Sequence, residues 1–578
     1  MKVQRKRLTT IGLMWAFVSL LFAQSRVNAA DSQFDKIVED YFAARFEYRP
    51  SEGTAAGLHE YDHRLEDLSQ ESVIRRIEEL VEFKRQLAAL KRDMASRKAR
   101  LPDDDEIDLI FLQWQVEAEL IDLNVLREWA RNPMGYTGLP GGAVDLLIKR
   151  DFARPAERLR AVVSREKRIP ALFEAARKNI KEPPREFTDL AIRMAKGSLG
   201  FFEGPVAAWA EQAASEDKRL LAEFQEWNAR AIAAFREFAA WLETDLKPRS
   251  TGRFAIGKDL FLAKLKTEEM VEISLEKLLA RGEANLEKDY QAFVATAKRI
   301  DPNKSPAEVM KLLSDQHPTA EDLIPSVRRS VEAARQYLID HQIVTVPSEV
   351  RPNIEETPPY ARSGSFASMD TPGPYETRAT QAFYYVTPVE KDWDAKHVEE
   401  HLRLYNPPVV AMINVHEAYP GHYLQFLYAK RFPTKVRKLL YCGTNAEGWA
   451  HYCEQMMVDE GFGGGDPKVR LAQLQEALLR DCRYVVGIKL HTQGWSVEQG
   501  AELFVDKGFQ EPANAYEESR RGAYNPTYLY YTLGKLEIQK LRDDFRAKKG
   551  GTLRDVHDAF VAQGGLPLPL VRQILLRE

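Results

Sequence analysis

Residues 406–425 read Asn406-Pro-Pro-Val-Val-Ala-Met-Ile-Asn-Val-His416-Glu417-Ala-Tyr-Pro420-Gly421-His422-Tyr-Leu-Gln425. Asn406 is a suitable helix N-cap, and prolines are tolerated in the first turn of a helix. The apolar residues that follow would point in nearly every direction around a helix, so the segment is predicted to be a buried helix. Buried ionisable side chains must be paired or bind a metal, and the His-Glu and His of this helix therefore need a partner.

The two histidines are six residues apart, whereas the zinc-protease motif H-E-x-x-H places its histidines four residues apart on one helix face. On a regular helix, six steps leave two side chains about 120° apart. Pro420 cannot donate a hydrogen bond to the carbonyl of His416, and Gly421 tolerates unusual backbone angles. A bulge that absorbs two residues would return His422 to the position that a four-residue spacing gives. The sequence thus predicts a distorted helix.

A third ligand is expected from a second segment, Asn445-Ala-Glu447-Gly-Trp449-Ala-His451-Tyr-Cys-Glu454. Asn445 is a candidate N-cap for a helix here. Glu447 follows His422 by 25 residues, which leaves room for a turn and an antiparallel second helix. A carboxylate from that helix would complete a His–His–Glu ligand set.

Each residue of this set has an expected role. His416, His422 and Glu447 would hold one zinc ion per chain and leave a fourth position for water. Glu417 would be the general base that deprotonates this water. His451 lies one turn from Glu447 and is either a rival ligand or a residue that supports the ligands. A His–His–carboxylate site also accepts divalent ions other than zinc.

The two segments resemble the signature of the bacterial domain-of-unknown-function 885 family, a zincin-like group of proposed metallopeptidases. That signature is H-E-x-x-P-G-H-x-x-Q followed by E-G-W-A-x-Y, and residues 416–425 and 447–452 match it. The stretch 50–62 resembles the family's opening motif, so the resemblance covers about residues 34–578. It implies a mainly helical, cleft-containing architecture similar to that of neurolysin-type peptidases, with the same three ligands and the same base.

Two later segments, residues 483–496 and 521–535, also resemble the family. The first contains His491. In the second, Tyr531 falls where the family has a tyrosine near the metal when the segments are aligned on Gly534, whereas alignment on Pro526 shifts the register by one residue. Either side chain could donate a hydrogen bond to the oxyanion that forms when water attacks a carbonyl. The alternatives are a core histidine and an aromatic packing face. The family usually has Asp at the position of Gly487, and this departure weakens the assignment of a hydrogen-bond partner to His491.

The rest of the chain predicts a mainly α fold with a small β element next to the metal site. Amphipathic helical periodicity covers most of the first 340 residues and resumes from about residue 395. The Gly- and Pro-rich stretch 133–142 predicts a loop between helices, and 351–380 is loop-like. The aromatic run 382–387 predicts a strand. We divide the chain into a signal peptide (1–29), an N-terminal helical region (30–340) and a C-terminal metal-site region (341–578), the last two within one continuous family domain.

Residues 1–29 predict a secretory signal peptide, with a basic start, a 13-residue apolar stretch and a small-residue cleavage site. The alternative is an uncleaved anchor, although residues 8–25 include several polar side chains and would span a bilayer only marginally. No cysteine lies near the cleavage point, so a lipoprotein anchor is not indicated. Cys442, Cys453 and Cys482 cannot form a disulfide framework, but a single bridge is open to them. The expected location is periplasmic or secreted.

Composition excludes several classes of function. The 578 residues include 82 basic and 86 acidic side chains, with no basic block after the first seven residues, so nucleic-acid binding is not expected. No nucleotide-binding or serine-hydrolase motif is found. The sequence predicts a secreted zinc hydrolase of peptide bonds, with a peptide substrate and no stable membrane insertion after signal removal. The alternatives are a zinc amidohydrolase acting on cell-wall or small amide substrates and a non-catalytic peptide-binding relative. The sequence leaves the oligomeric state open.

Overall fold

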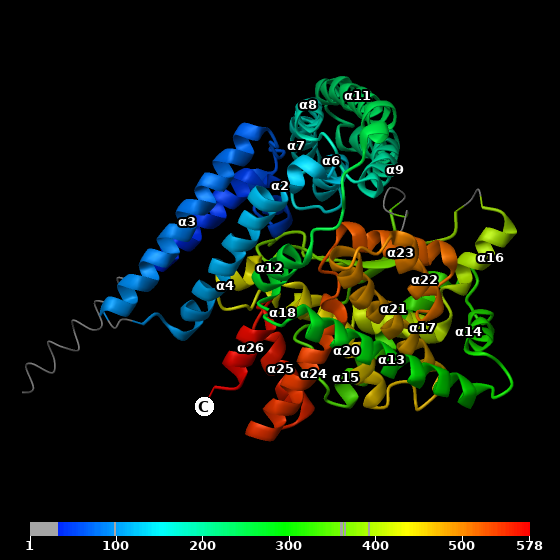
Figure 1. The fold of residues 1–578 in the computed structure, drawn as a ribbon. Helices are drawn as coiled ribbons and strands as arrows, with labels where there is room; N and C mark the ends of the chain where they lie inside the picture. Colours follow the sequence, from blue (N-terminus) through cyan, green and yellow to red (C-terminus); the bar gives the residue numbers. More distant parts are fainter. Residues whose placement is uncertain (1–32, 98–99, 359–361, 363–365, 391–392, 578) are drawn as a thin grey trace, which may run out of the picture.

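The computed structural model describes residues 33–577 except 98–99, 359–361, 363–365 and 391–392. The predicted signal peptide lies outside these residues. The chain is mainly α with one small sheet, as the sequence predicts (Figure 1). No helix in the described part of the chain is both long and apolar enough to cross a bilayer.

The N-terminal part of the described chain is a long helical arm (Figure 1). Residues 33–48 form a helix, and its Tyr41 ring meets Phe83 of the following hairpin edge-on at 5.6 Å. Leu80 and Leu112 of the hairpin are fully buried in a core that also includes C-terminal helices. The arm comprises α2 (Pro50–Ala56), the 3-10 turn η1 (His59–Tyr61), α3 (Gln70–Arg97), α4 (Asp103–Leu120) and its π-helical extension η2 (Ile121–Leu126).

A helical bundle above the arm has a separate core (Figure 1). Phe173 and Phe238 stack at its centre with ring centroids 4.3 Å apart. The bundle comprises α5 (Glu128–Arg131), α6 (Met134–Ile148), α7 (Pro155–Glu166), α8 (Ile169–Asn179), α9 (Arg185–Phe201), η3 (Phe202–Val206), α10 (Ala207–Ala213), α11 (Lys218–Trp241), η4 (Leu242–Leu246) and η5 (Lys247–Arg249).

The predicted loop at 133–142 is wrong, because Pro133 is the N-cap of α6 and the rest of the stretch lies in this helix, which continues through Pro140. Tyr136, Val144 and Leu147 of this helix are buried in the bundle core. Burial of three large side chains on one face outweighs the poor helix propensity of the glycines and the hydrogen bond that proline cannot make.

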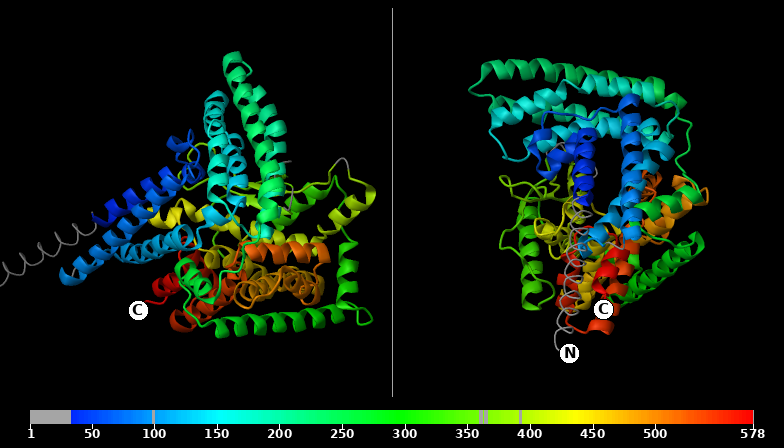
Figure 2. Two further views of the ribbon diagram at one scale, coloured as in Figure 1. Left: turned by 45° about the horizontal axis from the view of Figure 1, so that its top comes forward. Right: turned by 90° about the vertical axis from the view of Figure 1, so that its left-hand side faces the viewer.

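The remaining helices form the lower body, where the long α13 runs along the base (green in Figure 2). Cys442, Cys453 and Cys482 are buried here and unpaired, so the single disulfide that the sequence leaves open is not formed. The helices are α12 (Lys258–Glu269), α13 (Leu275–Ile300), α14 (Pro306–Ser314), α15 (Leu323–Asp340), α16 (Ala395–Arg403), α17 (Pro407–Glu417), α18 (His422–Ala429), α19 (Lys435–Leu439), α20 (Gly443–Asp459), α21 (Pro467–Thr492), α22 (Val497–Asp506), α23 (Pro512–Tyr524), α24 (Tyr530–Lys549), α25 (Leu553–Val561) and α26 (Leu568–Leu575).

The sheet has three short strands in the order β1-β3-β2. The predicted strand at 382–387 is confirmed as β3 (Phe383–Val386), which pairs in parallel with β1 (Asn353–Glu356) and antiparallel with β2 (Ala367–Asp370). The expectation that 351–380 is all loop is wrong at β1 and β2. The prolines of this stretch flank both strands rather than interrupt them, so the pairing with β3 is not prevented.

A cleft of about 2570 Å³ opens beside this sheet. Its lining comes from the first helix, from β2 with the loop that follows it, and from α17, α18, α20, α21, α23 and α24. Side chains far apart in the sequence therefore face one space, and the two segments singled out from the sequence both line it.

Candidate metal centre

The first segment forms two helices instead of one bent helix. Asn406 caps α17, and its side-chain oxygen accepts a hydrogen bond from the Val409 N–H at 3.2 Å, as predicted. The helix ends at Glu417, and α18 begins at His422. The distortion expected between the histidines is thus a complete break of four residues.

The hydrogen bonds of the break account for the unusual spacing. The Gly421 N–H donates to the Val415 carbonyl at 2.9 Å, and the Leu424 N–H donates to the Ala418 carbonyl at 3.3 Å. Both bonds span six residues instead of the four of an α-helix, so the break absorbs two residues. A Cβ atom on Gly421 would lie 1.7 Å from the His416 carbonyl oxygen, which leaves room only for glycine.

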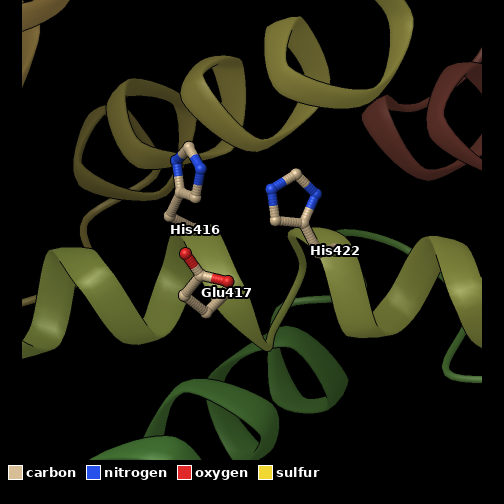
Figure 3. A group of neighbouring side chains, drawn as sticks. All are labelled: His416, Glu417 and His422. Atoms are coloured by element: carbon tan, nitrogen blue, oxygen red, sulfur yellow. The ribbon is translucent and has the colours of Figure 1, made fainter. Parts of the chain in front are cut away.

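This geometry brings the two imidazoles together. The rings of His416 and His422 are 4.9 Å apart between centroids and nearly perpendicular. Figure 3 shows both rings on the same side of the broken helix, with the Glu417 carboxylate below them near His416. One potential ligand atom from each of these three residues lies within 4.8 Å of the others. The group could hold a metal ion.

Glu447 approaches the same two rings from α20. Its Oε2 atom lies 3.4 Å from the Nε2 atom of His416 and 3.4 Å from that of His422. Ligand atoms about 2.0–2.1 Å from a tetrahedral zinc ion are separated by about 3.3–3.4 Å. The distances from Glu447 to both histidines therefore match the separation between ligands of one shared divalent ion.

Two contacts fix α20 in this position. Gly448 packs against Gly534 of α24, because a Cβ on Gly448 would lie 2.5 Å from the Gly534 Cα. The helix begins at Gly443, and its N-terminal N–H groups donate to the carboxylate of Glu269. Asn445 is therefore not the N-cap that the sequence predicts; it lies inside the helix and donates to the carbonyls of residues 564 and 566.

A second carboxylate, that of Glu454, orients His416 by bonding the ring nitrogen that does not face Glu447. Its Oε1 atom accepts a hydrogen bond from His416 Nδ1 at 2.6 Å, which leaves Nε2 facing Glu447. Glu454 is fully buried and also accepts a hydrogen bond from His451 Nδ1 at 3.2 Å. His451 is thus joined to the candidate ligands through Glu454. The sequence alone predicts no role for Glu454. Glu454 follows Glu447 by seven residues, or two helical turns, so the two side chains share one face of the helix.

The site attracts positive charge. Burial disfavours a charged imidazole, but hydrogen bonds to Glu447 and Glu454 outweigh it and raise the pKa of His416 to about 10. Burial also opposes ionisation of Glu447, yet the charge of His422 and the hydrogen bond from His416 hold the pKa of its carboxyl well below the usual range. Burial and nearby Lys535 lower the pKa of His451 to about 3, so His451 is neutral.

The two candidate oxyanion donors lie in different places. Tyr531 lines the cleft, and its ring lies 6.4 Å from that of His416. Its hydroxyl accepts a hydrogen bond from Arg521 at 3.2 Å, so its own proton remains free to be donated. His491 does not line this cleft: it is buried, its Nε2 bonds the Gly522 carbonyl at 2.8 Å, and its Nδ1 accepts from a backbone N–H.

Fold and site together define a mainly helical protein with a buried His/Glu group able to hold a metal ion. The chain belongs to the family described as "Bacterial protein of unknown function (DUF885)", which matches residues 50–575. No curated protein matches the chain.

Two solved structures share the fold. One, described as a putative lipoprotein of unknown function from Shewanella oneidensis, is 25% identical, covers 94% of this chain and 100% of its own, and has a TM-score of 0.76. The other, described as a putative lipoprotein from Colwellia psychrerythraea, is 17% identical, covers 94% of this chain and 98% of its own, and has a TM-score of 0.78.

Proposed function

We propose that this protein is an exported, zinc-dependent peptidase. The observation that carries the proposal is the position of Glu447 Oε2, which lies 3.4 Å from the Nε2 atoms of both histidines. An ordinary buried ion pair needs only one imidazole per carboxylate. A carboxylate oxygen about 3.4 Å from two imidazole nitrogens is the separation expected between ligand atoms of one tetrahedral ion.

The donor set fits a catalytic zinc site. His416, His422 and Glu447 would be the ligands, and Glu454 would fix the tautomer of His416, as second carboxylates do in known histidine–zinc sites. Three protein ligands leave one position open, which distinguishes catalytic from structural zinc sites. Zinc bound here would polarise a substrate carbonyl and lower the pKa of a water molecule.

Glu417 and Tyr531 are then suited to the two remaining tasks. Glu417 follows His416 directly and has a carboxylate oxygen within 4.8 Å of both imidazoles, so it can take the proton of an attacking water and later transfer it to the leaving amine. Tyr531 has a free hydroxyl proton on the cleft side and can donate it in a hydrogen bond to the oxyanion. His491 is too far into the core to share this role.

The cleft supports a peptide substrate over a small amide. Its volume of about 2570 Å³ exceeds the 300–1,000 Å³ that is usual for small-molecule sites. β3 is the central strand and has both edges paired, so it cannot pair with an extended substrate. β2 lines the cleft and is an edge strand, so it is the strand that can pair with an extended chain.

Export to the cell envelope is part of the proposal. The two solved relatives are described as lipoproteins, and residues 1–29 of this chain have the pattern of a signal peptide. Those residues contain no cysteine that a lipid could modify, so we propose release by cleavage as the route for this chain.

The test is zinc content together with peptide cleavage. We expect about one zinc per chain by elemental analysis, and loss of cleavage of a mixed peptide library after chelation, with recovery when zinc is added. Glu417→Gln should keep the zinc and lose at least about 10²-fold in kcat. If the wild-type protein bound zinc, left every peptide intact and hydrolysed cross-linked cell-wall or small amides, the result would favour the amidohydrolase alternative.

A further inference from the structure

Arg521 is a cleft guanidinium that has no carboxylate partner among the described residues. It lies in the last turn of α23, lines the cleft and is half-buried. Its side chain makes one hydrogen bond, to the hydroxyl oxygen of Tyr531 at 3.2 Å. A guanidinium has five N–H donors, so most of those on Arg521 have no acceptor in the described chain. A partly desolvated cation without a counter-charge needs an explanation.

The neighbouring arginines form ion pairs with carboxylates, whereas Arg521 forms none within the described chain. Arg483 donates from Nε and Nη2 to the two oxygens of Glu518, at 2.7 and 2.8 Å. Arg480 forms an ion pair with Glu476. Arg483 repels Arg521 and Glu518 attracts it, but both oxygens of Glu518 are already hydrogen-bonded by Arg483. Arg521 is therefore the guanidinium of this group that has no carboxylate of its own among the described residues.

The position of Arg521 relates it to the proposed chemistry. Its Nη2 atom is 3.2 Å from the Tyr531 hydroxyl, and the Tyr531 ring lies 6.4 Å from the ring of His416. An extended residue spans about 3.3–3.6 Å. An anion held by Arg521 would therefore lie one or two residues from a carbonyl that Tyr531 contacts.

His491 and Gly522 fix the backbone beside Arg521. His491 Nε2 bonds the Gly522 carbonyl at 2.8 Å, and a Cβ on Gly522 would lie 2.4 Å from the Tyr528 hydroxyl. The end of α23 is thus packed tightly against α21 and the segment that precedes α24. The fixed backbone sets where the side chain starts, and the planar guanidinium loses less freedom per hydrogen bond than a flexible donor when it binds a planar anion. His491 is in this view a positioning residue for Arg521.

The geometry points to Arg521 as the residue that binds the C-terminal carboxylate of a peptide, so that the enzyme removes one or two residues from the carboxyl end. This inference rests on the proposed peptidase function. A guanidinium pairs with a carboxylate through two parallel hydrogen bonds, and the unpaired donors of Arg521 provide for that. An acidic side chain near the scissile bond offers the same chemistry, and the test must separate the two sources.

The experiment uses the zinc-loaded protein and three peptides of one sequence: the free acid, the C-terminal amide, and an amide with a glutamate near its end. Early products are identified by mass spectrometry. We expect the wild type to shorten the acid from its carboxyl end, with kcat/KM about 10- to 100-fold above the amide, the range expected from a charge-assisted hydrogen bond. Arg521→Gln should reduce this acid-to-amide ratio to about one. Arg403→Gln, which removes a cleft arginine that is paired with Asp315 and Glu399, should keep it.

Three results would overturn the assignment. Equal loss on acid and amide in Arg521→Gln would mean that Arg521 acts only through Tyr531. A preference for the amide that carries the glutamate would mean that Arg521 binds an acidic side chain of the substrate. First cuts far from the carboxyl end would exclude recognition of the terminus and leave the peptidase function intact.

A binding measurement separates this inference from the proposed function. The chelated protein should bind the free acid at least about 10-fold more tightly than the amide in titration calorimetry, and Arg521→Gln should lose that difference. If wild-type protein cleaves no peptide, the peptidase proposal fails, and this binding difference still decides whether Arg521 recognises a terminal carboxylate.

Discussion

The indole Nε1 of Trp449 donates a hydrogen bond to the carbonyl oxygen of Pro420 at 2.8 Å. Pro420 lies in the break between the two histidines, and Trp449 is fully buried two residues after Glu447. A broken helix leaves carbonyl groups without their usual donors, and this indole supplies one of them. The bond joins the two sequence segments directly, so the distance between the histidines and Glu447 depends on it.

Removing only this donor should weaken the site. Trp449→Phe keeps an aromatic ring and leaves the Pro420 carbonyl buried without a partner, which costs about 1–3 kcal/mol. We expect lower stability in urea unfolding and weaker zinc binding in competition with a chelator. Trp227→Phe is the control, because Trp227 lies on α11 in the upper bundle, where its ring contacts Lys167 and Arg230, and a phenyl ring keeps an aromatic face for them. Unchanged zinc affinity in Trp449→Phe would show that the break holds its shape without the indole.

Glu454→Gln tests whether the carboxylate behind His416 matters for the metal. The change keeps the size of the side chain but removes the negative charge of the carboxylate that accepts the hydrogen bond from His416 Nδ1 at 2.6 Å. We expect zinc affinity to fall about 10- to 100-fold, measured by chelator competition. Glu460→Gln, at the exposed end of the same helix, should bind zinc like the wild type. If both variants bind equally, Glu454 has no part in the site.

Tyr531 and its neighbour Tyr530 provide a matched pair. Both line the cleft, but the Tyr530 hydroxyl accepts a hydrogen bond from Asn525, whereas the Tyr531 ring lies beside that of His416. Tyr531→Phe should lower kcat about 10²- to 10³-fold with zinc content and KM little changed. Tyr530→Phe should have a much smaller effect on kcat. The reverse order of effects would assign the donor role to Tyr530.

Several features of the site could be predicted because they depend on short-range sequence. Pro420 and Gly421 between the histidines predicted a distortion that absorbs two residues, and the six-residue hydrogen bonds have that length. Asn406 was predicted as a cap from its place before an apolar run, and it caps α17. In both cases, the backbone chemistry of one or two residues indicates the local structure, although the break is also supported by the distant indole of Trp449.

The features that could not be predicted depend on contacts between distant residues. β1 and β2 are four residues each and are strands only because β3 lies between them. Arg521 lacks a carboxylate partner among the described residues because Glu518 pairs with Arg483 instead. The spacing of these residues in the sequence does not determine which arginine Glu518 binds. The family resemblance offers His491 as an oxyanion donor, but its ring forms a hydrogen bond with the Gly522 carbonyl in the core.

A buried carboxyl far from the metal centre predicts how stability varies with pH. Glu166 of α7 is fully buried, both of its oxygens lack a hydrogen-bond partner, and burial raises its pKa well above 4.5. The folded state then holds a proton that the unfolded state releases above pH 4.5. This stabilisation is complete below about pH 4.5 and is lost as the pH rises through the folded-state pKa.

Glu166→Gln removes that proton linkage. We expect the free energy of unfolding of the variant to rise relative to wild type by up to about 1.4 kcal/mol per pH unit above pH 4.5. Urea unfolding at pH 5, 6, 7 and 8 measures the difference. Glu174→Gln, an exposed position on α8, should follow the wild type at every pH. A Glu166→Gln difference that does not grow with pH would mean that Glu166 ionises freely in the folded protein.

Gly421→Ala tests whether the break in the helix sets the metal site. The new Cβ would lie 1.7 Å from the His416 carbonyl oxygen and 2.4 Å from its carbon, so the backbone that carries His416 must move. We expect a loss of stability of about 1–3 kcal/mol or more and a loss of zinc affinity larger than that in Trp449→Phe. Gly197→Ala is the control, because Gly197 lies in α9 with open space around its Cβ position. That change should stabilise the protein by about 0.5–1 kcal/mol and leave zinc binding intact. If Gly421→Ala bound zinc normally, the convergence of the two histidines would not depend on the close approach between Gly421 and His416.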